Sequence, residues 1–406
     1  MLQVEIDPQE AGFDPARLNR IDRHYQRYVD EGKLPGFLAV IARDGRLVHV
    51  AKGGLRDVDA GTPVEADTLF RVYSMTKPIT SVAAMMLWEE GAFELKDPVS
   101  RFIPAFADAR VWTGGSQTQP ETAAPREPVR MWHLLTHTSG LAYGFAWAHP
   151  VDGIYRDRGF EFGSPAGMDL AGCVDVWAGL PLLFEPGTEF NYSVSTDVLG
   201  RVVEVLSGQS LDAFFKQRIF DPLGMPDTAF GDADPQRLAA LYAPGLVRND
   251  RLGAAALGEP RFLSGGGGLI STAADYHRFT QMLLGGGELD GARLLGTRTL
   301  RYMGRNHLPG GAELKAVARP TISETQNEGM GFGLGFSVVL DPVANRSPTT
   351  RGEFAWGGAA STAFWVDPAE GVTALFFTQL LPSSTWPIRS ELRQLVYQAL
   401  IAPRSG

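Results

Sequence analysis

The spacing of apolar residues predicts a helix and then a β-hairpin at the start of the chain. Asp14 and Pro15 form a typical N-cap and first-turn pair. Apolar residues then recur on one helical face at Leu18, Ile21, Tyr25, Tyr28 and Val29. Two apolar segments follow at residues 37–42 and 47–52, joined by Asp44-Gly45, and Asp-Gly between apolar segments is a strong hairpin signal.

The last third of the chain has the residue content typical of strands, whereas the middle has helical periodicity. We predict strands at residues 332–340, 353–356, 361–366 and 372–377, and a closing helix at residues 391–401. In the middle, helical patterns occur at residues 198–206 and 211–219, and two long loops rich in Gly and Pro span residues 112–128 and 142–165. Loops of this length in a compact fold usually carry function.

This order of elements predicts an α/β fold. We expect an antiparallel sheet flanked by helices, built from both chain ends around an inserted, mostly helical domain. The α/β domain is placed at residues 1–73 and 254–406, and the helical domain at residues 74–253, with the active site at their interface.

The composition is that of a soluble globular protein and argues against several classes of function. Apolar residues make up 44% and charged residues 20% of 406 positions, and apolar stretches such as residues 81–88 are too short to span a bilayer. A net charge of −9 without a basic run argues against nucleic-acid binding. Residues 1–7 lack the features of a signal peptide, so we expect a cytoplasmic protein. Cys173 is the only cysteine, so no internal disulfide forms.

Ser74 and Lys77 form the strongest candidate for chemistry. Their three-residue spacing at a helix start places the hydroxyl and the amine on one face, where a neutral amine could activate the hydroxyl as a nucleophile. The alternative is a serine that caps an ordinary helix. Of the six lysines, only Lys77 has a serine three positions before it.

Tyr192 is the candidate for moving protons. It lies just before a predicted helix, and a phenol becomes a competent base when a nearby positive charge, such as that of Lys77, lowers its pKa. The alternative is a packed aromatic residue whose hydroxyl is hydrogen-bonded.

The segment Trp356-Gly357-Gly358-Ala359, at the end of a predicted strand, is the candidate for an oxyanion-binding backbone. Glycines allow substrate to approach a strand whose N–H groups face the nucleophile. The alternative is a Gly-rich bulge or turn.

Other catalytic patterns find little support in the sequence. No serine lies in a Gly-x-Ser-x-Gly elbow. His133 and His137 have helical spacing, but Leu134 stands where a zinc protease carries Glu, so we interpret both histidines as structural. The glycines at residues 265–268 and 329–335 lack dinucleotide-binding spacing and are interpreted as strand approaches near the site.

Taken together in this order, the three candidate segments resemble the serine β-lactamase and penicillin-binding-protein superfamily. The chain looks most like the family VIII carboxylesterases, which share the fold of class C β-lactamases. Residues 133–141, 185–187 and 264–272 also resemble segments of that family, and the similarity covers nearly the whole chain.

The resemblance implies a role for each candidate. Ser74 would be the acylated nucleophile, Lys77 its partner, and Tyr192 the residue that exchanges protons with Lys77. The backbone N–H groups of Ser74 and Ala359 would form the oxyanion hole, at the end of the strand Trp356-Gly357-Gly358. No metal or cofactor is implied.

Departures from the β-lactamase pattern point to an ester substrate. Trp356 and Gly357 stand where β-lactamases carry Lys-Thr, so an apolar wall replaces the cation that holds the antibiotic's carboxylate. Val194 stands where the second motif usually carries Asn. Tyr143 and Trp147, in the second long loop, are expected to line the pocket.

The leading hypothesis is a serine carboxylesterase for neutral short-acyl esters, with weak β-lactam hydrolysis as a side activity. An acyltransferase on the same scaffold is the main alternative, followed by a β-lactamase or a D-Ala peptidase-type enzyme. A non-catalytic sensor, acylated without turnover, is the hypothesis from another class. The expected partner is a small-molecule ester, with no nucleic acid or membrane and no oligomeric state assigned.

Overall fold

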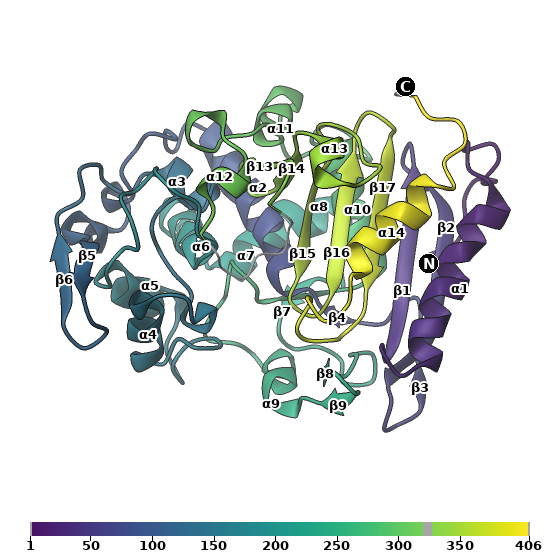
Figure 1. Cartoon of the computed structure of the whole chain (residues 1–406), viewed down its shortest axis with the longest axis horizontal. Coiled ribbons are helices and arrows are strands. Elements are labelled where there is room, and N and C mark those ends of the chain that lie inside the picture. Colours follow the sequence, from purple (N-terminus) through teal and green to yellow (C-terminus); the bar gives the residue numbers. More distant parts are fainter. Residues whose placement is uncertain (1, 320–326, 405–406) are drawn as a thin grey trace.

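The central sheet takes strands from both ends of the chain (Figure 1). In the computed structural model, which describes residues 2–319 and 327–404, its strands are β1 Gly36–Arg43, β2 Arg46–Asp57, β3 Thr62–Pro63, β13 Met330–Phe332, β14 Ser337–Val339, β15 Phe354–Gly358, β16 Thr362–Asp367 and β17 Val372–Phe377. They pair in the order β13-β14-β15-β16-β17-β1-β2-β3. Every pairing is antiparallel, and β1 joins the two chain ends by pairing with β17. The predicted fold class is confirmed.

The predicted N-terminal hairpin forms at the turn that the sequence indicates. β1 and β2 are joined by Asp44 and Gly45, whose φ angles are 50° and 82°. A two-residue turn with both φ angles positive matches the right-handed twist of paired strands, and glycine adopts that conformation without strain. β2 extends to Asp57, well beyond the predicted end at residue 52.

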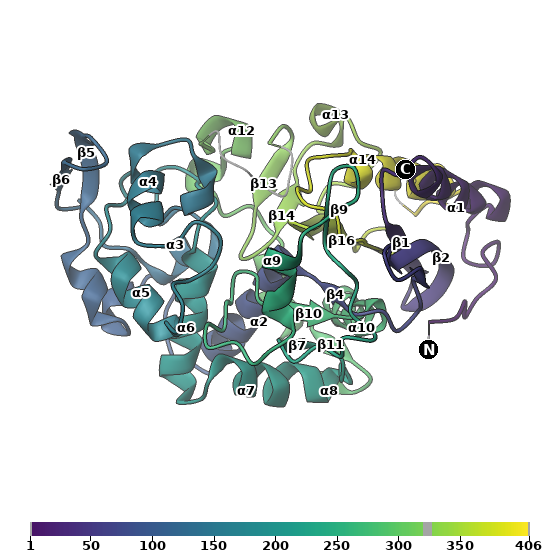
Figure 2. The same ribbon diagram turned by 90° about the horizontal axis from the view of Figure 1, so that it is seen from below.

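Helices cover both faces of the sheet. On one face lie α1 (Pro15–Asp30) and α14 (Ile388–Tyr397), and on the other lies α10 (Ala273–Leu284), as Figure 2 shows. On the first face, Tyr25 of α1 packs on Phe376 of β17 with ring centroids 4.5 Å apart. On the second face, Tyr276 of α10 packs on Phe364 of β16 at 5.3 Å. The central strands β1, β15, β16 and β17 are therefore buried on both sides.

The middle of the chain forms the helical part seen at the left of Figure 1. Its main helices are α2 Thr76–Glu89, α3 Met131–Leu135, α4 Pro150–Asp157, α5 Leu170–Ala178, α6 Ser195–Ser207 and α7 Leu211–Phe215. Every residue of α2 from Thr76 to Leu87 is buried, so this helix runs through the interior of the molecule. The predicted domain boundaries at residues 73/74 and 253/254 stay a prediction.

The strand predicted at residues 332–340 is wrong, because two short strands occupy this stretch. β13 and β14 form a hairpin around residues 333–336. Gly335 has a φ of 98°, and a Cβ on Gly333 would lie 2.0 Å from the Met303 oxygen. Both positions require glycine. The two glycines allow the chain to turn at a place where the strand-like periodicity alone predicts a continuous strand.

The two predicted long loops contain regular structure. In the first loop, β5 (Val111–Gly115) pairs with β6 (Pro120–Ala123). The second loop contains a short 3-10 turn, η4 (Gly144–Ala146), and α4. Pro150 occupies the first turn of α4, and the Asp152 carboxylate accepts from the backbone N–H of His149 at 2.9 Å. These are ordinary helix-start signals in a segment where glycine and proline dominate the sequence pattern.

The remaining elements are short. They are β4 Phe70–Arg71, β7 Ala229–Phe230, β8 Tyr242–Ala243, β9 Val247–Arg248, β10 Leu269–Ser271, β11 Glu288–Leu289, β12 Ala292–Arg293, α8 Asp221–Leu223, α9 Asp250–Gly253, α11 Thr297–Met303, α12 Leu314–Val317 and α13 Pro342–Asn345. The closing helix α14 starts and ends a few residues earlier than predicted. Within the two described ranges, none of the helices combines the length and apolar character needed to cross a bilayer.

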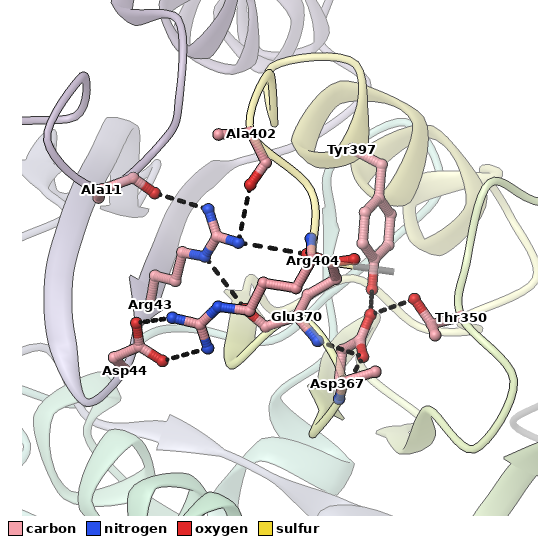
Figure 3. Close-up of polar contacts among 10 residues, drawn as sticks. Ala11, Arg43, Asp44, Thr350, Asp367, Glu370, Tyr397, Ala402 and Arg404 are labelled. Carbon is pink, nitrogen blue, oxygen red and sulfur yellow. Dashed lines mark hydrogen bonds and ion pairs between the residues drawn. The ribbon is translucent and has the colours of Figure 1, made fainter. Parts of the chain in front are cut away.

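A buried ion pair joins the tip of the β1–β2 hairpin to the turn between β16 and β17 (Figure 3). Arg43 is 5% exposed, and its Nη2 lies 3.2 Å from Glu370 Oε2. The guanidinium also donates to three backbone oxygens, those of Ala11, Ala402 and Glu370. Arg404 forms a second, solvent-exposed ion pair with Asp44. The two arginines therefore differ in burial and in the backbone hydrogen bonds that only the Arg43 side chain makes.

Replacing Arg43 by Met leaves the Glu370 carboxylate buried without its counter-charge. We expect the free energy of unfolding to fall by about 3–5 kcal/mol, because an uncompensated buried charge is strongly unfavourable. Urea denaturation followed by circular dichroism measures the change.

Arg404→Met is the matched control, and we expect a loss of at most about 1 kcal/mol because its ion pair is exposed to solvent. Equal losses for the two variants would contradict the assignment of the Arg43–Glu370 pair as a stabilising contact between the two turns.

Candidate active site

Ser74 lies in a 3-10 turn, η1 (Tyr73–Met75), that leads directly into α2. The chain enters this turn through Tyr73, whose φ of 44° is rare for a residue with a side chain and costs about 1 kcal/mol or more. The hydroxyl of Tyr276, from α10, donates to the Met75 oxygen at 2.8 Å and holds the turn. Ser74 is therefore fixed, half-buried, where the chain passes from β4 into the buried helix.

Lys77 lies one helical turn after Ser74, and its amine reaches the serine as the spacing predicts. The side chain is 2% exposed, and Nζ lies 3.3 Å from Ser74 Oγ. Nζ also donates to the Gly266 oxygen at 2.6 Å. Gly266 belongs to residues 265–268, which the sequence placed near the site.

Asp197, in the first turn of α6, was not identified from the sequence. Its Oδ1 accepts from the Gly266 N–H at 3.0 Å and from Ser264 Oγ at 2.5 Å, so it fixes the loop that holds Lys77. Burial raises the pKa of this carboxyl, and the charge of Lys77 opposes that rise. A Cβ on residue 266 would lie 2.4 Å from Asp197 Oδ2, so glycine is required. No local pattern reveals a contact between residues 69 positions apart.

Tyr192 lies over the amine of Lys77. Nζ is 4.5 Å from the centroid of its ring, and the side chain is 3% exposed. Three rings contact Tyr192 edge-on: Tyr143 at 5.5 Å, Trp356 at 5.5 Å and His137 at 5.0 Å. Tyr143 also lies near the amine, with its ring centroid 5.4 Å from Nζ. The structure therefore brings the predicted catalytic residues and two predicted pocket residues together.

The two histidines near the site are neutral at neutral pH. Burial lowers the pKa of His133 to about 3, and burial, together with the charge of Lys77, lowers the pKa of His137 well below its usual range. With pKa values this low, both imidazoles are weak bases, so the assignment of proton transfer to Lys77 and Tyr192 stays the prediction. Among the residues that the structure describes, no group of three or more His, Cys, Asp or Glu side chains is placed to hold a metal ion.

β15 brings Gly357 and Gly358 beside the turn that carries Ser74. A Cβ on Gly358 would lie 2.3 Å from the Val72 oxygen, so the missing side chain lets the strand approach the entrance of η1. Ala359 follows in the turn to β16. Its N–H as an oxyanion donor stays a prediction, as does the same role for the N–H of Ser74.

Val194, predicted to face substrate, caps the N-terminus of α6 and is 4% exposed. Its side chain belongs to the main hydrophobic core. Its backbone N–H donates to the Ala142 oxygen, which anchors the residue before Tyr143. A contact between Val194 and substrate stays a prediction.

Arg389, at the start of α14, is a second residue that the sequence did not reveal. Its Nη2 donates to the Gly358 oxygen at 3.0 Å and to the Thr362 oxygen at 3.1 Å, so it spans the turn that contains Ala359. A Cβ on Gly357 would lie 2.3 Å from this guanidinium, so glycine makes room for it. Arg389 is therefore placed to fix the geometry of the β15–β16 turn.

Comparison with known proteins assigns the family. A family model described as Beta-lactamase matches residues 21–398. The chain belongs to the beta-lactamase family. It is a serine hydrolase with the fold of that family.

Individual relatives cover nearly the full chain. Protein Rv1367c of Mycobacterium tuberculosis is 37% identical over 87% of this chain and 88% of its own length. Esterase EstB of Burkholderia gladioli is 32% identical over 98% of this chain and 100% of its own. The solved structure of EstCE1, described as a hydrolase with promiscuous acyltransferase activity, superposes with a TM-score of 0.80 at 27% identity, covering 97% and 99% of the two chains.

Replacing Arg389 by Ala should lower kcat about tenfold with little change in KM. The predicted oxyanion donor Ala359 lies in the β15–β16 turn, so a displaced turn should weaken a contact made mainly in the transition state and lower kcat and kcat/KM together. Steady-state hydrolysis of a short ester measures both constants, and Arg389→Lys should recover part of the loss. Gln394→Ala, an exposed change on the same helix, is the control. A higher KM with unchanged kcat would show that Arg389 does not act through the turn.

Proposed function

We propose that the protein is a serine carboxylesterase that hydrolyses neutral short-acyl esters through an acyl-enzyme on Ser74. The observation that carries the proposal is the contact between Ser74 Oγ and the buried Lys77 amine beneath the ring of Tyr192. A hydroxyl held against an amine, with a phenol beside it, is the arrangement of an activated nucleophile with its proton acceptor.

In the acylation step, the Lys77–Tyr192 pair accepts the hydroxyl proton of Ser74 while Oγ attacks the ester carbonyl carbon. The resulting oxyanion is stabilised by the backbone N–H groups of Ser74 and Ala359. Collapse of this intermediate breaks the bond to the alcohol oxygen, which receives the proton back from the pair. Water then repeats the sequence on the acyl-enzyme and releases the acid.

The proposed preference for neutral esters rests on the walls of the site. Trp356 packs edge-on against both Tyr192 and Phe332, so an indole stands where the resemblance to β-lactamases would place a lysine. The nearby guanidinium of Arg389 donates to backbone oxygens behind the strand. A carboxylate on the substrate would therefore lose water and face an apolar wall. Faster hydrolysis of a cephalosporin than of a short neutral ester would contradict this substrate class.

An acyltransferase is the second candidate, favoured by the description of EstCE1 as a hydrolase with promiscuous acyltransferase activity. In that reaction an alcohol takes the place of water in the second step. The ratio of new ester to free acid, measured with increasing amounts of added alcohol, separates the two activities.

Ser74→Ala should reduce the hydrolysis of ethyl butanoate about 10³-fold or more, since it removes the hydroxyl that carries the acyl group. Tyr192→Phe should reduce kcat about 10²-fold, because it keeps the ring and removes the proton carrier. A pH-stat assay of acid release measures both. Tyr302→Phe, an exposed tyrosine on α11, is the control for loss of a phenolic hydroxyl. Retention of more than about a tenth of the activity by Ser74→Ala would refute the nucleophile assignment.

A further inference from the structure

A row of aromatic rings leads from the catalytic residues to the surface. Tyr143 contacts Tyr192 at 5.5 Å and stacks on Phe145 at 4.6 Å, and Phe145 lies parallel to Phe162 at 6.1 Å. Tyr143 and Phe145 are half-buried, whereas Phe162 is 60% exposed. The row therefore begins at Lys77 and Tyr192 and ends in solvent.

The turn η4, which follows Tyr143 and contains Phe145, is held in place from α4. Arg156 of α4 donates from Nη1 to the Gly144 oxygen at 2.5 Å, and its guanidinium lies 3.5 Å from the ring centroid of Trp147. A Cβ on Gly144 would lie 2.3 Å from the Phe160 oxygen, so the turn packs tightly on its neighbour. The rings are therefore presented on a fixed backbone, which reduces the entropy lost when a ligand binds.

Single exposed apolar side chains are common and need no explanation, but this set is contiguous. Phe162 and Trp147, which is 66% exposed, are both large exposed hydrophobic residues within one short segment. A row of rings that runs from the catalytic residues to exposed apolar side chains is typical of a ligand-binding surface. Flat rings in a stacked row favour a planar or extended apolar group, which they can contact on its faces.

We propose that Tyr143, Phe145 and Phe162 bind an apolar, ring-bearing group of the ester substrate. The inference rests on the proposed esterase activity. It specifies an ester that is unbranched and small next to its carbonyl carbon and carries a bulky apolar group further along the molecule. Trp147, which follows η4 in the chain, packs on the same Arg156 guanidinium that holds this turn.

The test compares three esters on the wild type and on Phe145→Ala and Phe162→Ala. Methyl propanoate carries no ring, methyl 3-phenylpropanoate carries one in the acyl part, and 2-phenylethyl acetate carries one in the alcohol part. In the variants we expect kcat/KM for at least one ring-bearing ester to fall about 5- to 10-fold through KM, as lost ring contacts imply. The ester affected identifies which part of the substrate lies on the rings. Methyl propanoate should change less than about twofold.

Tyr302→Ala, which removes an exposed ring on α11, is the matched control and should leave all three esters unchanged. An equal loss on all three esters in the Phe variants would indicate a structural role and overturn the inference, as would no change on either ring-bearing ester. Hydrolysis of methyl propanoate that survives Ser74→Ala would instead refute the proposed esterase mechanism, so the two failures are distinguishable.

Discussion

The structure depends on keeping the amine of Lys77 in the interior beside Ser74. A buried amine is unfavourable unless hydrogen-bond acceptors surround it, and here the Gly266 oxygen lies at 2.6 Å with Asp197 behind the same loop. α2 is buried along nearly its whole length, so helix, loop and amine are packed as one unit. The packing of α2 against the rest of the protein keeps the Lys77 amine beside the Ser74 hydroxyl and shielded from water. An isolated helix would leave both groups open to solvent.

The second constraint is how closely backbones must approach around that pair. Gly266 lies against the Asp197 carboxylate, and Gly358 lies against the Val72 oxygen, each at a distance that excludes a Cβ. The first contact fixes the loop that holds Lys77, and the second brings strand β15 to the turn that carries Ser74. Gly266 and Gly358 therefore allow the close backbone contacts that place the catalytic residues. Arg389 fixes strand β15 from the opposite side.

The sequence predicts the local features and misses the distant contacts. The Asp44-Gly45 hairpin, the first helix and the reach of Lys77 to Ser74 follow from short-range rules, and the structure has all three. Asp197 and Arg389 act on loops far away in the chain, and spacing carries no information about such contacts. The prediction of one continuous strand at residues 332–340 fails for a related reason, because Gly333 packs against Met303 and Gly335 against Ser81, and both contacts are distant in the sequence.

The account makes one central claim, that an ester acylates Ser74. Its most direct test is mass spectrometry of the protein after acid quenching within seconds of mixing with a slowly deacylating ester. The account predicts a mass increase equal to the acyl group on the tryptic peptide of residues 72–96, which stays intact because Pro78 follows Lys77. The adduct should map to Ser74 and be absent from Ser74→Ala. Product formation without any adduct, or an adduct on another residue, would contradict the account.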